Sequence, residues 1–252
     1  MDPLSFFDCN CSFGLRRVVH PGSFYKPDEL VEKMKRYGIH KAIVYHSMAK
    51  EYSPLVGNEM LMSEIKGSEC LYPAWVVMPH HSGEFPHPET LKNQMKSGNV
   101  RAVLMFPAPL EQNYSIAEWN CGELFSMLEK CSVPLMIGFD QLTLNELFEL
   151  CSSYQELKVI LTGVNYRVDR NFYALLRKLP NLYIETSGYK VHNGIEEFCE
   201  QFGAQRLIFG SGMPLYSGGA AVSMINYARI SEKEKCMIAY ENIESLLGGA
   251  QL

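Results

Sequence analysis

The chain has 252 residues, of which 47% are hydrophobic and 20% are charged, and its formal net charge at pH 7 is −5. This length suits one large α/β domain or two small ones, and the apolar content is sufficient for a sizeable core. The near balance of charges, with no basic cluster longer than Arg16-Arg17, argues against nucleic acid or an acidic membrane surface as a partner. The sequence shows no positively charged leader and no apolar run of about 18 residues, so we expect a soluble, cytoplasmic protein.

Short apolar runs alternate with amphipathic segments along the whole chain. The apolar runs predict strands at Leu4–Cys9, Lys41–His46, Tyr72–Met78, Arg101–Phe106, Pro134–Phe139, Lys158–Leu161, Leu182–Thr186 and Arg206–Phe209. The segments with apolar residues at helical spacing predict helices at Asp28–Tyr37, Ala117–Lys130, Asn145–Tyr154, Phe172–Lys178 and Ile195–Phe202.

This alternation predicts the fold class. Runs such as Val159–Leu161 are apolar at every position, which is typical of parallel strands covered on both faces. Eight β–α repeats in this length favour an α/β fold, a single-domain (β/α)8 TIM barrel spanning residues 1–252, with some irregularity allowed. An open doubly wound sheet is the alternative, but it usually has fewer strands and a glycine-rich phosphate loop, and the chain has no GxGxxG motif. No linker rich in Pro, Gly or Ser divides the sequence.

The cysteines are expected to be reduced and buried. There are eight, with no CxxC pair, and without a secretory signal they predict small core side chains rather than a disulfide framework. Cys9 and Cys11 are separated by one residue, so simple strand alternation would turn both toward one face. Their polar neighbours Asp8, Asn10 and Ser12 would then point the other way. A metal half-site at the two cysteines is the less favoured interpretation.

Polar side chains follow nearly every predicted strand. Active sites of TIM barrels lie at the carboxyl ends of their strands, so these residues are the candidates for a site. They are Asp8, Asn10, Ser12, His46, His80, Asp140, Thr162, Tyr166, Arg167, Glu185, Ser187 and Ser211.

Three of these residues are candidate catalytic groups, because carboxylates and imidazoles exchange protons near neutral pH. We expect Asp8 to face the barrel interior, the alternative being a structural acid that caps loop backbone. Asp140 is the second acid or base, unless it caps the helix that opens near Thr143. His46 is the third, unless it only makes a local hydrogen bond.

The remaining candidates are expected to contact a small-molecule ligand. Arg167 would bind a carboxylate in bidentate fashion, or else it is a solvated loop arginine. Glu185 and Ser187 would bind substrate, or else bond to the neighbouring strand and loop. Ser211 also fits a structural role at a tight turn. A phosphate or nicotinamide site has only the Gly218-Gly219 turn in its favour.

Three motifs, the last of them in two segments, together carry a family resemblance. The opening FFDCNCSFG, Phe6–Gly14, resembles an apolar pair followed by Asp-x-His-x-His-x-Gly. Lys158–Gly163 resembles a strand-six segment that ends near a His and a Gly. The closing RLIFGSGMP, Arg206–Pro214, resembles a Gly-Ser-Asp-x-Pro strand, and Glu241–Leu247 resembles the Gly-Asn-Ala-x-x-Leu-Leu helix that follows it. This combination is similar to the amidohydrolase-related family of metal-dependent hydrolases, which have the TIM-barrel fold.

The resemblance implies a metal site, and the sequence departs from it. In the family, strand-one histidines, later histidines and the strand-eight aspartate hold a divalent metal that makes hydroxide from water. At the matching positions this chain has Asn10, Ser12, Gly138, Thr162 and Gly212. Neutral oxygen ligands bind zinc weakly and glycine offers none, so we expect no metal at the family's site. A zinc site relocated to Asp8, His46, His80 and His81 is the alternative.

Two functions therefore follow from the sequence. The first is an amidohydrolase-like barrel with a degenerate metal centre, which binds a small molecule at the carboxyl end of the barrel without the family's metal-dependent hydrolysis. The alternative is an active hydrolase or decarboxylase for a small carboxylated substrate, using a relocated metal or a metal-free acid–base pair such as Asp8 with Asp140 or His46. A homo-oligomeric state is left open.

Overall fold

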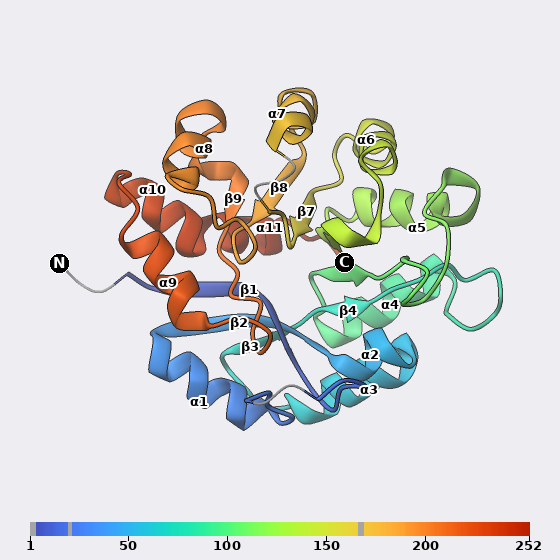
Figure 1. Ribbon diagram of the computed structural model, residues 1–252. Coiled ribbons are helices and arrows are strands. Elements are labelled where there is room, and N and C mark those ends of the chain that lie inside the picture. The colour runs from blue at the N-terminus through green and yellow to red at the C-terminus, as the bar shows by residue number, and fades with distance from the viewer. Residues whose placement is uncertain (1–3, 20–21, 166–168) are drawn as a thin grey trace.

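The computed structural model describes residues 4–19, 22–165 and 169–252. Strands gather in the centre of the molecule and helices surround them (Figure 1). No helix among the described residues is both long and apolar enough to cross a membrane. The strands are β1 (Phe6–Phe13), β2 (Ile39–His46), β3 (Leu71–Pro73), β4 (Trp75–Val76), β5 (Val103–Met105), β6 (Leu135–Gly138), β7 (Val159–Thr162), β8 (Leu182–Glu185) and β9 (Leu207–Ile208).

The helices alternate with the strands in the order that the sequence predicts. Further helices lie in segments for which no helix was predicted. The α-helices are α1 (Pro27–Tyr37), α2 (Ser47–Glu51), α3 (Pro54–Glu64), α4 (Pro88–Gly98), α5 (Glu118–Lys130), α6 (Leu144–Ser153), α7 (Asp169–Lys178), α8 (Gly194–Phe202), α9 (Gly218–Asn226), α10 (Glu232–Cys236) and α11 (Asn242–Gly248). Shorter turns are the 3₁₀ helices η1 (Phe139–Gln141) and η3 (Ala204–Arg206) and the π-helical turn η4 (Met237–Glu241).

All strand pairings are parallel and fall into two runs, β1-β2-β3 and β4 to β9 in order. The two runs meet at Ala74, whose N–H donates to the Val44 carbonyl at 2.9 Å. The next N–H, of Trp75, donates instead to the Ala102 carbonyl at 3.2 Å. The single strand predicted over residues 72–78 is thus divided where its partner changes from β2 to β5.

Backbone hydrogen bonds also link the last strand to the first. Cys9 N–H donates to the Phe209 carbonyl at 3.0 Å, and Ser12 N–H donates to the Met213 carbonyl at 3.0 Å. A parallel bridge pairs Cys11 with Met213. These bonds bring the outer edges of the two runs together, and the fold is the α/β TIM barrel that the sequence predicts.

The core has an inner and an outer layer. The outer layer packs between strands and helices and includes Phe6, Cys11 and Phe13. The inner layer fills the barrel with buried side chains from successive strands: Phe7, Cys9, Ile43, Ala74, Val76, Ala102, Leu104, Met136, Ile160 and Ile208. Each large apolar side chain buried in this way contributes about 1.5–3 kcal/mol to folding.

Strand β1 departs from simple alternation. Its pairing with β2 shifts, so that Asp8 faces Ala42 and Cys11 faces Val44, with two residues of β1 opposite one of β2. This is a β-bulge, which moves the following side chains by one position. Cys9 consequently packs in the inner layer and Cys11 in the outer layer. The prediction that both cysteines face one side was wrong because of this bulge.

Candidate functional site

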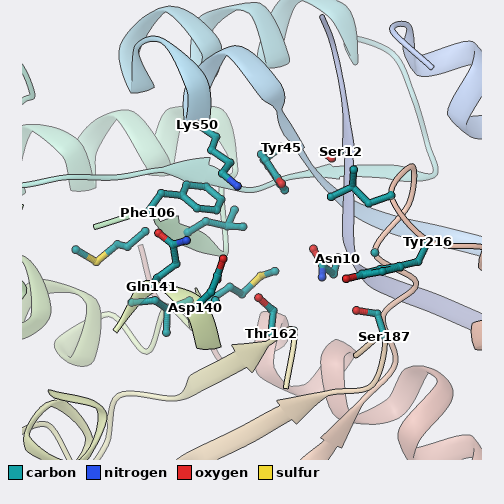
Figure 2. Close-up of a pocket in the computed structure, with 18 of the residues that line it drawn as sticks. Asn10, Ser12, Tyr45, Lys50, Phe106, Asp140, Gln141, Thr162, Ser187 and Tyr216 are labelled. Carbon is teal, nitrogen blue, oxygen red and sulfur yellow. The ribbon is translucent and has the colours of Figure 1, made fainter. Parts of the chain in front are cut away.

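A cavity of about 120 Å³ opens at the carboxyl end of the barrel (Figure 2). One water occupies about 10–15 Å³ on this measure, so the space suits a ligand of roughly ten non-hydrogen atoms. We call it the barrel cavity. Its polar lining residues are Asn10, Ser12, Tyr45, Lys50, Asp140, Gln141, Thr162, Ser187 and Tyr216. Its apolar lining residues are Leu104, Met105, Phe106, Met136, Ile137, Met213 and Leu215.

The five positions that correspond to the family's metal ligands all line this cavity. Asn10 and Ser12 come from β1, Gly138 from the end of β6, Thr162 from the end of β7, and Gly212 from the segment after β9. The five positions matched by sequence motif therefore also lie together in the structure. In this chain, however, the five positions supply one amide, two hydroxyls and two glycines.

Neighbouring side chains fill the space next to both glycines. A Cβ atom on Gly138 would lie 2.5 Å from Asp140 Oδ1. Gly212 has a φ of +67°, and a Cβ atom there would lie 2.6 Å from Cδ2 of Tyr216. Neither glycine position accepts a larger side chain without displacement of its neighbour. Asp140 and Tyr216 thus occupy the places that a histidine and an aspartate would need.

Of the three remaining positions, Asn10 and Ser12 already have hydrogen-bond partners. Asn10 Nδ2 donates to Glu185 Oε2 at 3.1 Å, and Ser12 Oγ accepts a hydrogen bond from Arg16. Divalent metals of this family prefer imidazole and carboxylate ligands, and Asp140 is the one carboxylate among the described lining residues. A guanidinium beside Ser12 further disfavours a cation. The residues at the family's positions do not fit a divalent metal.

Glu185 lies directly behind the cavity wall. It is the last residue of β8 and fully buried, and its carboxylate accepts hydrogen bonds from Asn10 Nδ2 and, at 2.8 Å, from Ser187 Oγ. Burial raises the pKa of Glu185 to about 7, and nearby Asp8 adds to this, while the bonds from Ser187 and Asn10 oppose it. Gly210 provides the necessary room, because a Cβ atom there would lie 2.2 Å from Glu185 Oε1. Glu185 therefore exchanges a proton near neutral pH, with Asn10 and Ser187 between it and the cavity.

Asp8 occupies a different environment from the one expected. It is fully buried but does not line the cavity, because its side chain turns to the junction of β1 with the segment after β9. Oδ1 accepts the N–H groups of Asn10 at 3.0 Å and Ser211 at 2.9 Å, and Oδ2 accepts Cys11 Sγ–H at 3.0 Å. The pKa of Asp8 is raised by burial, against the effect of these donors. The expectation that Asp8 faces the barrel interior was wrong; it ties two strands together, as in the structural alternative.

Ser211 shares this junction. Its N–H is committed to Asp8, its Oγ accepts the Met213 N–H at 3.1 Å, and it does not line the cavity. This arrangement matches a structural role at a tight turn.

His46 also lies away from the cavity. Its Nδ1 accepts the Met48 N–H at 3.1 Å and caps α2, while its Nε2 lies 3.6 Å from Glu64 Oε1. The ring packs edge-on against Phe13 of the outer layer at 5.3 Å. Burial lowers the pKa of His46, which favours the neutral ring. The structure does not bring His46 together with Asp8 or Asp140, so the acid–base pairs proposed for them are not formed.

His80 belongs to the loop between β4 and α4 and does not line the cavity. Among the described residues, the one group of three side chains that could hold a metal contains His80 but neither Asp8 nor His46. The relocated site predicted from Asp8, His46, His80 and His81 is therefore not assembled among the described residues. Tyr166 and Arg167 lie outside the described residues.

Sequence reasoning missed several residues of the cavity, and Lys50 matters most among them. It stands on α2, directly after β2, and its Nζ lies 3.1 Å from Glu111 Oε1 and 4.9 Å from the centroid of the Phe106 ring. Figure 2 shows it reaching toward the cavity from one side, opposite Asn10 and Ser187. Its position one turn beyond a strand end was the available signal. Tyr45, Gln141 and Tyr216 were also missed.

Comparisons with known proteins agree with this architecture. A family profile described as amidohydrolase matches residues 71–249. No curated protein sequence matches the chain.

Solved structures with a similar fold match nearly the whole chain. An uncharacterised TIM-barrel protein from Bordetella bronchiseptica has a TM-score of 0.74 at 15% identity, covering 98% of this chain and 99% of its own. The 2,6-dihydroxybenzoate decarboxylase from Rhizobium has a TM-score of 0.76 at 14% identity, with 98% and 99% covered. A dihydroxybenzoic acid decarboxylase from Polaromonas sp. JS666, solved with bound manganese and the inhibitor 2-nitroresorcinol, has a TM-score of 0.75 at 13% identity, with 98% and 97% covered. At these identities the likeness shows the fold.

Proposed function

The chain belongs to the amidohydrolase family, and we propose that its barrel cavity binds a small aromatic carboxylate without the metal-dependent hydrolysis associated with the family. The observation that carries this proposal is the set of residues at the positions matched to the family's metal ligands, which offers no imidazole and no carboxylate. Gly138 and Gly212 are covered by Asp140 and Tyr216, so the cavity keeps its place in the barrel with a different set of contacts.

The cavity walls suit a flat, apolar ring. Leu104, Phe106 and Met136, on or next to two adjacent strands, line the cavity and join the buried inner layer. Apolar walls with a few convergent polar groups are the usual composition of small-molecule sites. A benzoate-sized molecule is of the size that the volume allows.

Two cations favour a carboxylate on that ring. Lys50 lines the cavity, and Arg16 is buried beside Ser12. No ion pair joins Arg16 to any carboxylate in the described part of the chain, and its Nε has no hydrogen-bond partner there. A buried cation without a counter-ion is costly, so an anionic ligand near Ser12 would relieve that cost. Solved relatives of the same fold that are named as dihydroxybenzoate decarboxylases lend support at the level of the fold.

Calorimetric titration tests the proposal. Benzoate and 2-hydroxybenzoate are titrated into chelator-treated protein, with phenol and cyclohexanecarboxylate as ligands that lack the carboxylate or the aromatic ring. We expect Lys50→Ala to weaken benzoate binding by roughly tenfold, which is about 1.4 kcal/mol. Lys41→Ala is the matched control, because Lys41 pairs with Glu244 and lines a separate hollow beside α11. Equal affinity for benzoate and phenol, or equal loss in both variants, would contradict the proposal.

Glu185 favours a second function, a metal-free decarboxylase or hydrolase. Decarboxylation replaces a carboxylate on carbon with a proton, and a carboxylic acid with a pKa of about 7 is suited to supply one. Ser187 lines the cavity and donates to Glu185, so it offers a route for that proton. Turnover of 2,6-dihydroxybenzoate by metal-depleted protein, abolished in Glu185→Gln, would establish this activity. Absence of turnover between about pH 5 and about pH 9, a range centred on the raised pKa of about 7 for Glu185, leaves binding as the function.

A further inference from the structure

Three side chains with metal-ligating atoms meet outside the barrel cavity. They are His80 in the loop between β4 and α4, His87 at the start of α4, and Glu123 in α5. One ligand atom from each residue lies within 4.8 Å of the other two. Neither the barrel cavity nor the residues aligned with the family's metal ligands include them.

The spacing is close to that of a tetrahedral site. Zinc–nitrogen and zinc–oxygen bonds of about 2.0–2.1 Å place the ligand atoms about 3.3 Å apart. His87 Nε2 lies 3.2 Å from Glu123 Oε2, so this edge of a tetrahedron is already formed. His80 completes the group after a small movement of its ring, since its atom is within 4.8 Å of both.

The loop that carries His80 is held by contacts independent of any ion. Gly83 N–H donates to the His80 carbonyl at 2.9 Å, and the side chain of Phe85 is buried. The His80 ring packs against those of His81, at 4.2 Å between centroids, and His87, at 4.7 Å. These contacts reduce the ordering that binding would otherwise require.

We propose that His80, His87 and Glu123 form a binding site for a divalent transition metal, with zinc preferred, that fastens the loop between β4 and α4 to α5. Two imidazoles and one carboxylate are the ligand types that zinc prefers, and a fourth position remains for water.

Binding has one identifiable cost. His87 Nδ1 accepts the Glu89 N–H over 3.4 Å, a long hydrogen bond at the start of α4. When the metal occupies Nε2, the ring proton must reside on Nδ1, and this bond is given up. A site with three protein ligands and this cost is expected to bind reversibly and to release its metal to a chelator.

The test is a titration of chelator-treated protein, free of any histidine tag, with Zn²⁺ and with Co²⁺. We expect one equivalent of metal and the visible absorption of tetrahedral Co²⁺. His87→Ala and Glu123→Ala should each lower the affinity by at least roughly tenfold. His81→Ala is the matched control, because His81 neighbours His80 without belonging to the group, and it should retain binding.

A second measurement tests whether the metal binds at this site or at other side chains of the protein. Hydrogen exchange of residues 80–87 should slow with Zn²⁺ in the parent protein and in His81→Ala, but not in His87→Ala. Binding that is unchanged in His87→Ala and Glu123→Ala would overturn the proposal. Loss of binding in a Cys70→Ser, Cys236→Ser double variant would overturn it as well, since it would assign the metal to these two partly exposed cysteines.

Discussion

Two regions of the barrel each contain a fully buried carboxylate, and they use it differently. At the junction of β1 with the segment after β9, Asp8 accepts two backbone N–H groups and a thiol. At the end of β8, Glu185 accepts the backbone N–H of Ser187 and also the side-chain donors of Asn10 and Ser187, both of which line the barrel cavity.

The difference lies in the side-chain donors: those of Glu185 line the cavity, whereas Asp8 accepts the Cys11 thiol, which is buried in the outer layer. Backbone donors from two strands fix Asp8 to the fold, so its removal leaves unsatisfied polar groups inside the barrel. The side-chain donors of Glu185 face a cavity and can exchange partners with a ligand. Burial raises the pKa of both carboxyls, so a raised pKa alone does not distinguish the two roles. The neighbours of each group do.

The largest expected effect is at the junction. Asp8→Ala removes the acceptor for Asn10 N–H, Ser211 N–H and Cys11 Sγ–H. Because each unsatisfied buried donor costs about 1–3 kcal/mol, we expect the free energy of unfolding to fall by about 3–5 kcal/mol. Urea denaturation monitored by circular dichroism measures this loss. A decrease below about 1 kcal/mol would mean that Asp8 does not hold the two strands together.

The second prediction concerns the pH dependence of stability. A carboxyl with a folded pKa of about 7 and a lower unfolded pKa binds more protons in the folded state, so stability is present at low pH and declines as pH rises toward 7. Relative to Glu185→Gln, the parent protein should lose on the order of 3 kcal/mol between pH 5 and pH 8. Denaturation midpoints of both proteins across this range provide the measurement. Parallel pH profiles would show that Glu185 is already charged throughout.

Gly212 lies between the two regions, and its substitution is expected to have an intermediate effect. Its N–H donates to the Asn10 carbonyl at 2.9 Å, and a Cβ atom would meet Tyr216 and Ser187. Gly212→Ala adds this crowding to an unfavourable φ of +67°, at a cost of about 1–2 kcal/mol. Thermal denaturation tests it, with Gly248→Ala as a control position where a Cβ meets nothing within 4 Å. Equal effects at the two positions would argue against the proposed crowding.

Ser187→Ala should have the smallest effect. Its Oγ–H stabilises the charged form of Glu185, so its loss raises the pKa of that carboxyl further. We expect the pH profile of stability to move upward by about one pH unit, while stability at pH 5 changes little. An NMR titration of the Glu185 carboxyl carbon reports the same change. A downward movement would contradict the assigned direction of this hydrogen bond.

Much of the architecture follows from local sequence pattern. Apolar runs and helical periodicity predicted the order of strands and helices because each reflects which faces of a segment are buried. Strand-end residues such as Asn10, Ser12, Asp140, Thr162 and Ser187 were identified because parallel strands in a barrel all end at one face, and the structure places them around the cavity.

The direction of a side chain was harder to predict from the sequence. A bulge after Asp8, set by the pairing with β2, breaks the alternation that would place Asp8 on the same side as Asn10, and Asp8 bonds to the segment after β9 instead. His46 was expected near Asp8 because it ends the strand next to the first one, yet its ring caps α2. For Asp8, the deciding contact comes from Ser211, which no local pattern relates to the strand.

The sequence by itself determined the barrel, the set of strand ends and the residue types at the positions that resemble the family's metal-ligand motifs, because these depend on residue type and order. Only the tertiary structure decided which of those residues share a cavity. Gly57 packs so closely on α2 that a Cβ atom would lie 2.0 Å from the Ala49 nitrogen, and α2 carries Lys50 to the cavity. Likewise, backbone geometry places the Asp140 carboxylate beside Gly138 and the Tyr216 ring beside Gly212. These two side chains limit the space that remains for a ligand.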